Sequence, residues 1–589
     1  MFRLKEESLP PDASEPADLE KLGYFINDFG QIRMIDHPDQ DYQFHWYSQE
    51  RHNEVRREAM QVCQRNEVLH RLSNLGIEKL YLPQLTNTQP KDPHIPILAP
   101  PADILKSRKR IVVLINDSLQ DLGILAYRRL QRELGVNGGS VVNFAKEMIT
   151  RSVELDKELD ITKDRAAITD KNKETPSLIV MNCGQPCYSY KENRALSLRS
   201  WATLPRKSIS HDTVILDPVY NFVPGHRNAK EHIKTVFDQV INNPDFVSPN
   251  AEIFVIGIEN GAENFLEMLN SEFGKYAGRI TAMAVVNSLL AASQLPNPKL
   301  RAFLRQRTRQ WRVATGSNDP KDCIEVPTAG PDVEIHDSST PSKSFSSKTK
   351  NIPEHINWLE NNSQAGTVST LVDCLKNFDL NPKNPMESAE EVDDTTDQTL
   401  CPTFADDDNP TGAGECIFTS PLVRRCILEF FEEVVRDPVG FRNPKFQITA
   451  HEPKYGNQFD ESGYQPLLPP EMSPEHMELH LKQEELATMK SSFAATPTDR
   501  PELQAGRQGL EKRIAKTESD IEVLEKKTLA NGGMKAGEAP ELRDNWKTVG
   551  GGPKIPFAGT MVDAELVRDA GLLDTVEEAL EELDSGTGD

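Results

Sequence analysis

The sequence predicts an α/β fold in which a mostly parallel β-sheet is flanked by helices. Short, strongly apolar segments with the pattern of buried strands alternate along the chain with amphipathic segments, which is the order that βαβ units produce. The strand segments are apolar on successive residues, as in RIVVLIND at 110–117. Such runs are typical of strands that are covered on both faces of a parallel sheet.

The elements follow one another from about residue 20. Two β-rich runs at 24–35 flank Asp28–Gly30 and predict a hairpin, and a charged helix begins at Ser48. Ser118 is expected to cap a helix that runs to about Leu134. The remaining strands are predicted at 177–182, 251–257, 279–286 and 310–314, and the remaining helices at 228–242 and 261–273.

Composition predicts a sizeable core domain together with disordered parts. Hydrophobic residues make up 37% of the 589, and the chain has 41 prolines. Residues 317–400 are rich in Ser, Thr and Asp, and they predict a disordered acidic insertion within the domain, because a strongly apolar helix begins after it at Ser420–Pro421. The expected organisation is a disordered segment 1–19, a domain in two parts at 20–316 and 401–450, a linker 451–470, a helical hairpin or short coiled coil 471–530 that could self-associate, and an acidic tail 531–589 with an amphipathic helix.

Charge and motifs exclude several classes of function. The net charge of −24 argues against a general nucleic-acid coat, and the eight cysteines, without a C-x-x-C pair, predict free thiols in a reducing compartment. The start of the chain lacks an apolar signal core, and no run approaches 18 apolar residues, so we expect no membrane span and a location in the nucleus, the cytoplasm or both. We expect no metal and no cofactor, since His226 and His232 lack ligand spacing and no phosphate-binding P-loop motif occurs.

The segment IFVIGIENGAENFLEML at 253–269 has the layout of the G-x-S-x-G nucleophile elbow of α/β-hydrolases: strand, tight turn, helix. Gly257, Asn260 and Gly261 frame the turn, and Glu259 stands where the serine would be. A carboxylate can act as a nucleophile, and His451 and Asp319 are then the candidate base and acid. Alternatively, Glu259 is structural, because an acidic side chain at a helix N-terminus stabilises it by about 0.3–1 kcal/mol.

A basic stretch at 299–312 has six positive charges, no acidic residue and two interleaved aromatic residues. Its candidate contacts with RNA phosphates or with an acidic partner are Arg305, Arg307, Arg309 and Arg312. The alternative is a helix with a solvated basic face that runs into a strand.

Several separate segments resemble one family. They are LGYFINDFGQIR, RSWATLPR, PGHRNAKEHIKTVFDQVI, IFVIGIENGAENFLEML, RITAMAVVNS and CIFTSPLVRRCILEFFEEVVRDP. Together they resemble the Argonaute-binding-protein (Arb) domain, over about residues 20–315 and 400–445. This α/β-hydrolase-like domain occurs in a subunit of the fungal Argonaute–small-RNA chaperone complex and at the C-terminus of fungal histone deacetylases.

The resemblance implies an interaction protein in small-RNA silencing and heterochromatin assembly. Its implied partners are Argonaute, histone deacetylase components or other chromatin proteins. Some relatives keep a serine at the elbow, so Glu259 favours a pseudo-hydrolase. The alternative hypothesis is an esterase-like hydrolase with Glu259 at the nucleophile elbow.

Overall fold

The computed structural model describes residues 9–153, 175–314, 317–327, 399–407, 414–449, 474–530, 554–557 and 560–563. The chain divides into two compact units. The first comprises residues 1–466 and 487–514 and contains the large sheet, and the second comprises 467–486 and 515–589.

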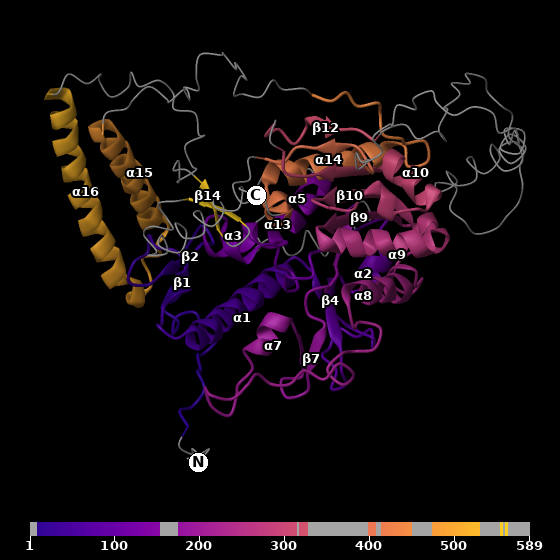
Figure 1. The fold of residues 1–589 in the computed structure, drawn as a ribbon, viewed down its shortest axis with the longest axis horizontal. Helices are drawn as coiled ribbons and strands as arrows, with labels where there is room; N and C mark the ends of the chain where they lie inside the picture. The colour runs from indigo at the N-terminus through magenta and orange to yellow at the C-terminus, as the bar shows by residue number, and fades with distance from the viewer. Residues whose placement is uncertain are drawn as a thin grey trace, which may run out of the picture. The chain divides into compact units, whose positions relative to one another are not determined.

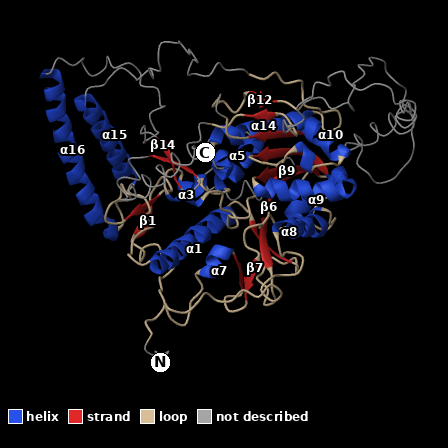
Figure 2. Ribbon diagram, in the orientation of Figure 1, coloured by secondary structure: helices blue, strands red, loops and turns tan. Residues whose placement is uncertain are grey.

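The first unit is built on a nine-stranded mixed sheet, which confirms the predicted fold class (Figure 2). The strand order is β12-β13-β11-β10-β9-β5-β6-β4-β3, and the six strands from β13 to β6 run parallel to their neighbours. The strands β3, β4 and β12 are antiparallel and lie at the two edges. The bounds are β3 Glu78–Leu82, β4 Ile95–Ala99, β5 Arg110–Ile115, β6 Ser177–Val180, β9 Glu252–Ile258, β10 Ile280–Val286, β11 Thr308–Trp311, β12 Cys323–Glu325 and β13 Thr403–Phe404.

Helices cover both faces of this sheet (Figure 1). Alternate residues of β5 enter different cores: Val112 and Leu114 pack with residues of α1, α5 and α14, whereas Ile111 and Val113 pack with residues of α8, α9 and α10. Full burial of such a side chain stabilises the fold by about 1.5–3 kcal/mol, which is why Ile111–Ile115 of β5 are apolar on successive residues. The helix bounds are α1 Glu50–Asn74, α2 Ala102–Ser107, α3 Tyr127–Gln131, α4 Gly135–Gly138, α5 Val142–Val153, α7 Leu198–Ala202, α8 Ala229–Val236, α9 Asn260–Tyr276, α10 Pro298–Arg307, α13 Gly414–Thr419 and α14 Pro421–Arg436.

Most predicted elements are present. The hairpin at 24–35 forms as β1 Tyr24–Ile26 and β2 Ile32–Met34, and the helix predicted at 228–242 is α8 continued by a π-helical turn, Phe237–Ile241. The side chain of Ser420 caps α14 by accepting hydrogen bonds from the backbone N–H groups of Leu422 and Val423. A second small hairpin, β7 Cys187–Ser189 with β8 Arg194–Leu196, was not predicted.

The prediction of a helix from Ser118 to about Leu134 is wrong. After β5 the chain forms turns, because the Asp117 carboxylate accepts a hydrogen bond from the Leu119 N–H and Gly123 adopts a φ of +83°. Helical structure begins only at Tyr127, in the short α3.

Order also extends beyond the predicted domain boundaries. Residues 9–19 were expected to be disordered, yet Asp12 pairs with Arg51 of α1 at 2.7 Å, with both side chains buried. The short strands β12 and β13 lie on either side of 328–398, within and just after the predicted insertion, and pair in the sheet. Residues 328–398 themselves lie outside the described residues, as do the predicted linker and most of the tail.

The predicted helical hairpin consists of α15 Pro474–Ala495 and α16 Gln504–Ala530, which contribute to both units. The part in the first unit is docked there: the Asp28 N–H donates to the carbonyl of Ala495 at 3.0 Å, and Arg513 pairs with Asp39. The second unit contains residues 474–486, 515–530 and the antiparallel strands β14 Lys554–Phe557 and β15 Thr560–Asp563. None of the described helices combines the length and apolarity required to cross a bilayer.

Candidate functional site

Glu259 lies at the sharp turn between β9 and α9, where the sequence predicts the elbow. Its backbone has φ 47° and ψ −126°, a conformation that costs energy for any residue other than glycine. Such strain persists where the surrounding structure imposes it and is common at functional sites. The predicted strand–turn–helix geometry is therefore present, with a glutamate at the nucleophile position.

Close backbone packing explains the two elbow glycines. A Cβ atom on Gly257 would lie 2.8 Å from the Cα of Ala262, and one on Gly261 would lie 2.4 Å from the carbonyl oxygen of Asn116. Real Cβ atoms do not approach backbone atoms so closely, so the spacing of the glycines reflects the passage of α9 across β9 and β5.

The Glu259 carboxylate has two hydrogen-bond donors from other segments. Its Oε1 accepts from the backbone N–H of Gly414 at 2.5 Å and from the Asn287 side-chain amide at 3.3 Å. Gly414 begins α13, and a Cβ atom there would lie 2.5 Å from the Cγ of Glu259. The chain at residue 414 thus lies directly against Glu259 and satisfies part of its charge.

Asp117 follows β5 and forms a carboxyl pair with Glu259. Burial, with the nearby charge of Glu259 as a further contribution, raises the pKa of Asp117 to about 6. The hydrolase oxyanion hole draws a backbone N–H from the loop after this strand. Here the Ser118 N–H donates instead to the Asn260 side chain at 2.9 Å, and a carboxyl group lies beside it. Negative charge at this point disfavours an oxyanion.

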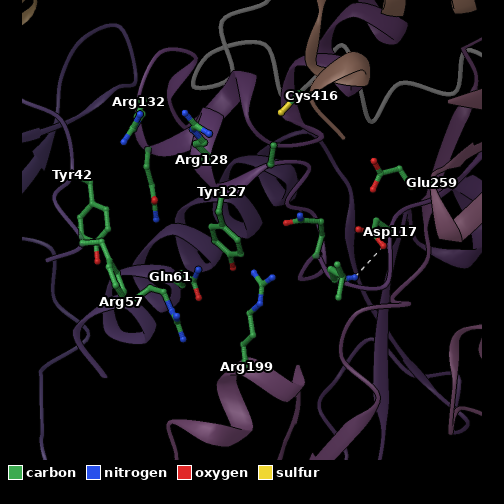
Figure 3. A pocket seen from close by; sticks show the side chains of 15 residues that line it. Tyr42, Arg57, Gln61, Asp117, Tyr127, Arg128, Arg132, Arg199, Glu259 and Cys416 are labelled. Atoms are coloured by element: carbon green, nitrogen blue, oxygen red, sulfur yellow. Dashed lines mark hydrogen bonds between the residues drawn. The ribbon is translucent and has the colours of Figure 1, made fainter. Parts of the chain in front are cut away.

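A cavity of about 600 Å³ extends from this carboxyl pair (Figure 3). Segments distant in sequence form its wall, including α1, α3, α7 and α13. Its lining residues are Tyr42, Phe44, Arg57, Gln61, Asp117, Leu119, Gln120, Ala126, Tyr127, Arg128, Gln131, Arg132, Arg199, Glu259 and Cys416.

The other residues of the hypothetical triad are placed differently. Asp319 lies exposed in a turn, where its carboxylate accepts a hydrogen bond from the Lys321 N–H at 2.9 Å, and it does not line the cavity. His451 lies outside the described residues. Among the residues that the structure describes, no histidine lines the cavity. The acid and base roles of Asp319 and His451 therefore stay predictions.

The basic stretch at 299–312 is placed partly in the interior. Arg307 is 1% exposed and donates to the carbonyl oxygens of Thr281, Pro438 and Val439. Arg309 is also buried and pairs with Glu433 at 2.6 Å. Both interpretations of the stretch placed these arginines at the surface. They hold the β10–β11 region to the end of α14 instead.

The other two candidate arginines of the stretch are less buried. Arg312 pairs with Glu325 of β12 at 2.8 Å, and Arg305 lies half-buried on α10. Among the four candidate arginines, a contact with RNA or an acidic partner would therefore depend on Arg305 and Arg312.

Sequence reasoning missed the arginines of the cavity. Arg57 is on α1, Arg128 is on α3 and Arg132 follows it, and Arg199 is on α7. No local spacing connects these positions, because the tertiary fold alone brings them together. Asp117 is different, since its place after the first central strand marks it as a neighbour of the elbow.

Comparison with protein families gives one match. The model described as the Arb2 domain matches residues 15–320, just over half of the chain, and this range contains the elbow, Asp117 and the cavity arginines. No curated protein and no solved structure gave a match.

Proposed function

The chain belongs to the Arb2 domain family, and from this membership we propose that it is a non-catalytic, hydrolase-fold interaction protein. In this proposal it acts as the related subunit of the Argonaute small-RNA chaperone complex does, through protein contacts in RNA silencing and heterochromatin assembly. Its partners would be Argonaute, histone deacetylase components or other chromatin proteins, in the nucleus, the cytoplasm or both.

The state of the Glu259 carboxylate is the observation that supports this proposal most directly. It accepts hydrogen bonds from Gly414 and Asn287, and its described neighbour in the cavity is a second carboxyl group, Asp117, rather than a histidine. An acyl-transfer site needs an activated nucleophile and donors aimed at an oxyanion. The described part of this site instead places two acidic groups together.

An exposed apolar segment offers a surface for a protein partner. Ile215 is 87% exposed, Val219 is 74% exposed and Tyr220 is 72% exposed. Grouped apolar side chains on a surface mark interaction sites more often than single ones do. They lie in the loop between α7 and α8, which is separate from the elbow.

The test is affinity purification of the tagged protein from its own cells, followed by mass spectrometry. We expect Argonaute, histone deacetylase components or other chromatin proteins to be enriched over an untagged control. Glu259→Ala should leave their recovery unchanged, whereas the double variant Ile215→Asp/Tyr220→Asp should lose it. The proposal is contradicted if the wild type enriches no protein over the untagged control. It is also contradicted if Glu259→Ala abolishes the recovery of the enriched proteins.

The strained elbow and the cavity beside it favour a second candidate function, an esterase-like hydrolase with Glu259 as the nucleophile. This hypothesis predicts turnover of small esters or epoxides that Glu259→Gln abolishes. The variant keeps the size of the side chain and removes its charge. Absence of turnover across a broad panel of both substrate types would eliminate this candidate.

A further inference from the structure

The cavity beside the elbow contains four arginines, Arg57, Arg128, Arg132 and Arg199. None of the four forms an ion pair with another described residue, and Arg128, Arg132 and Arg199 are exposed. Asp41 interacts electrostatically with Arg132, but its carboxylate forms its ion pair with Arg33. Figure 3 shows the arginines on the side of Tyr42 and Tyr127, with Asp117 and Glu259 on the other side.

Other arginines nearby are neutralised by the protein. Arg65 pairs with Glu58 and with Asp121, each at 2.6 Å, and Arg51 pairs with Asp12. These two arginines thus have carboxylate partners within the domain, and their ion pairs stabilise its packing. Among the residues that the structure describes, the cavity arginines have no such carboxylate partner. Guanidinium groups of this kind suit an external acceptor.

The charge of the lining selects the kind of acceptor. Four arginines against two carboxyl groups leave a net charge of +2 when both carboxyls are ionised. A carboxylate ligand would offset one charge, whereas a phosphate monoester carries about −1.5 to −2 at neutral pH. Guanidinium groups also match the oxygens of phosphate in two-point hydrogen bonding.

The rest of the cavity adds further selectivity. Its volume of about 600 Å³ suits a small molecule, and Tyr42, Phe44 and Tyr127 provide aromatic surface along it. Asp117 and Glu259 can accept hydrogen bonds from hydroxyl groups but repel a second anion.

We propose that the cavity binds a small phosphate-bearing ligand, with its phosphate on Arg57, Arg128, Arg132 and Arg199 and its hydroxyl groups toward Asp117 and Glu259. This site is independent of the proposed protein contacts and needs no reaction at Glu259. It gives the strained elbow a role in ligand recognition.

Isothermal titration calorimetry of the full chain with inorganic pyrophosphate tests the phosphate contacts, at an ionic strength held constant with sodium chloride. We expect saturable binding that Arg128→Gln/Arg199→Gln weakens about tenfold or more. Both side chains are exposed, so the variant should fold. The control is Arg425→Gln, an exposed arginine on α14 outside the cavity, which should bind as the wild type does. No saturable binding by the wild type, or equal loss in the control, overturns the proposal.

A second arm tests the carboxyl pair with a panel of sugar phosphates and nucleoside monophosphates. At least one should bind more tightly than inorganic phosphate, and Asp117→Asn should weaken that ligand while leaving pyrophosphate binding unchanged or stronger. If no member of the panel exceeds inorganic phosphate, or if Asp117→Asn weakens pyrophosphate equally, the part assigned to the carboxyl pair is wrong.

Discussion

At the scale of single residues, Glu259 combines a strained backbone with a side chain whose charge is already partly satisfied. The positive φ results from the sharp turn of the elbow itself, whereas the hydrogen bonds come from Gly414 and Asn287 on other segments. The sequence could predict the first, because the Gly257-x-Glu259-x-Gly261 spacing is local. It could not predict the second, because Gly414 is 155 residues away.

Two glycines of α9, Gly261 at the elbow and Gly274 near the helix C-terminus, give a matched pair of variants. Gly261→Ala should destabilise the protein by roughly 2–4 kcal/mol or prevent soluble expression, because its Cβ would meet backbone oxygen atoms of β5 and the residue after it. Gly274→Ala, on the exposed side of α9 with no atom within 4 Å of the new Cβ, should stabilise it by about 0.5–1 kcal/mol. Urea-unfolding midpoints measure both. Equal effects would show that the elbow tolerates a side chain at Gly261.

His226 and His232 form a buried pair that should make stability depend on pH. The Asn182 N–H donates to Nε2 of His232, so Nδ1 of His232 carries the proton and donates to Nδ1 of His226 at 2.7 Å. Burial lowers the pKa of His226 to about 4 and that of His232 well below its usual value. The unfolded chain therefore binds more protons than the folded one in mildly acidic solution.

The contribution of His226 to stability is complete above about pH 6.5 and is lost as the pH falls toward about 4. At pH 5 the loss from His226 is about 2 kcal/mol. His226→Gln keeps a hydrogen-bond acceptor for His232 without the titration, so its free energy of unfolding should fall less between pH 7 and pH 5. The wild type and variant are compared by urea unfolding at the two pH values. Parallel losses in both proteins would contradict this role.

At the scale of elements, a buried charge network joins α1 to the segments around the cavity. Arg65 pairs with Glu58 and Asp121, Tyr127 donates to Asp121 at 2.5 Å, and Ser200 of α7 donates to Glu58 at 2.9 Å. Breaking a buried pair by removing one partner leaves charge without compensation. The network therefore fixes the positions of α3 and α7, which carry the cavity arginines.

Arg65→Met should lower the free energy of unfolding by about 3–5 kcal/mol. Arg71→Met on the same helix removes a more exposed pair with Glu67 and one hydrogen bond to Asn137, and it should cost about 1–2 kcal/mol. Chemical denaturation gives both values. If the Arg65 variant loses no more than the Arg71 variant, the network is not what positions these helices.

The same contrast between local and distant signals explains which elements the sequence predicted. The central strands β5, β9 and β10 contain long apolar runs, and α8 and α14 have capping residues beside an apolar face, so each could be recognised locally. The edge strand β12 and its neighbour β13 have three and two residues, too few for a pattern. The segment after Ser118 has a helical composition, but side-chain hydrogen bonds and a left-handed Gly123 produce turns.

At the scale of the whole molecule, the helical hairpin belongs partly to the first unit and partly to the second. The residues near its turn are docked in the first unit through Ala495 and Arg513. The described helical segments of the second unit expose apolar side chains, among them Met477, Leu481 and Val523. Exposed apolar residues along helices favour association with another helix.

We therefore expect the full chain to self-associate through the second unit, in a manner that depends on concentration. Leu481→Glu/Val523→Glu should shift it toward the monomer, because charges within an apolar helix contact are costly to bury. Leu422→Glu, at an exposed apolar position on α14 of the first unit, is the matched control and should leave association unchanged. Sedimentation velocity over a range of concentrations distinguishes the cases. A wild-type chain that stays monomeric throughout, or a control that dissociates equally, would show that these helices serve a different partner or none.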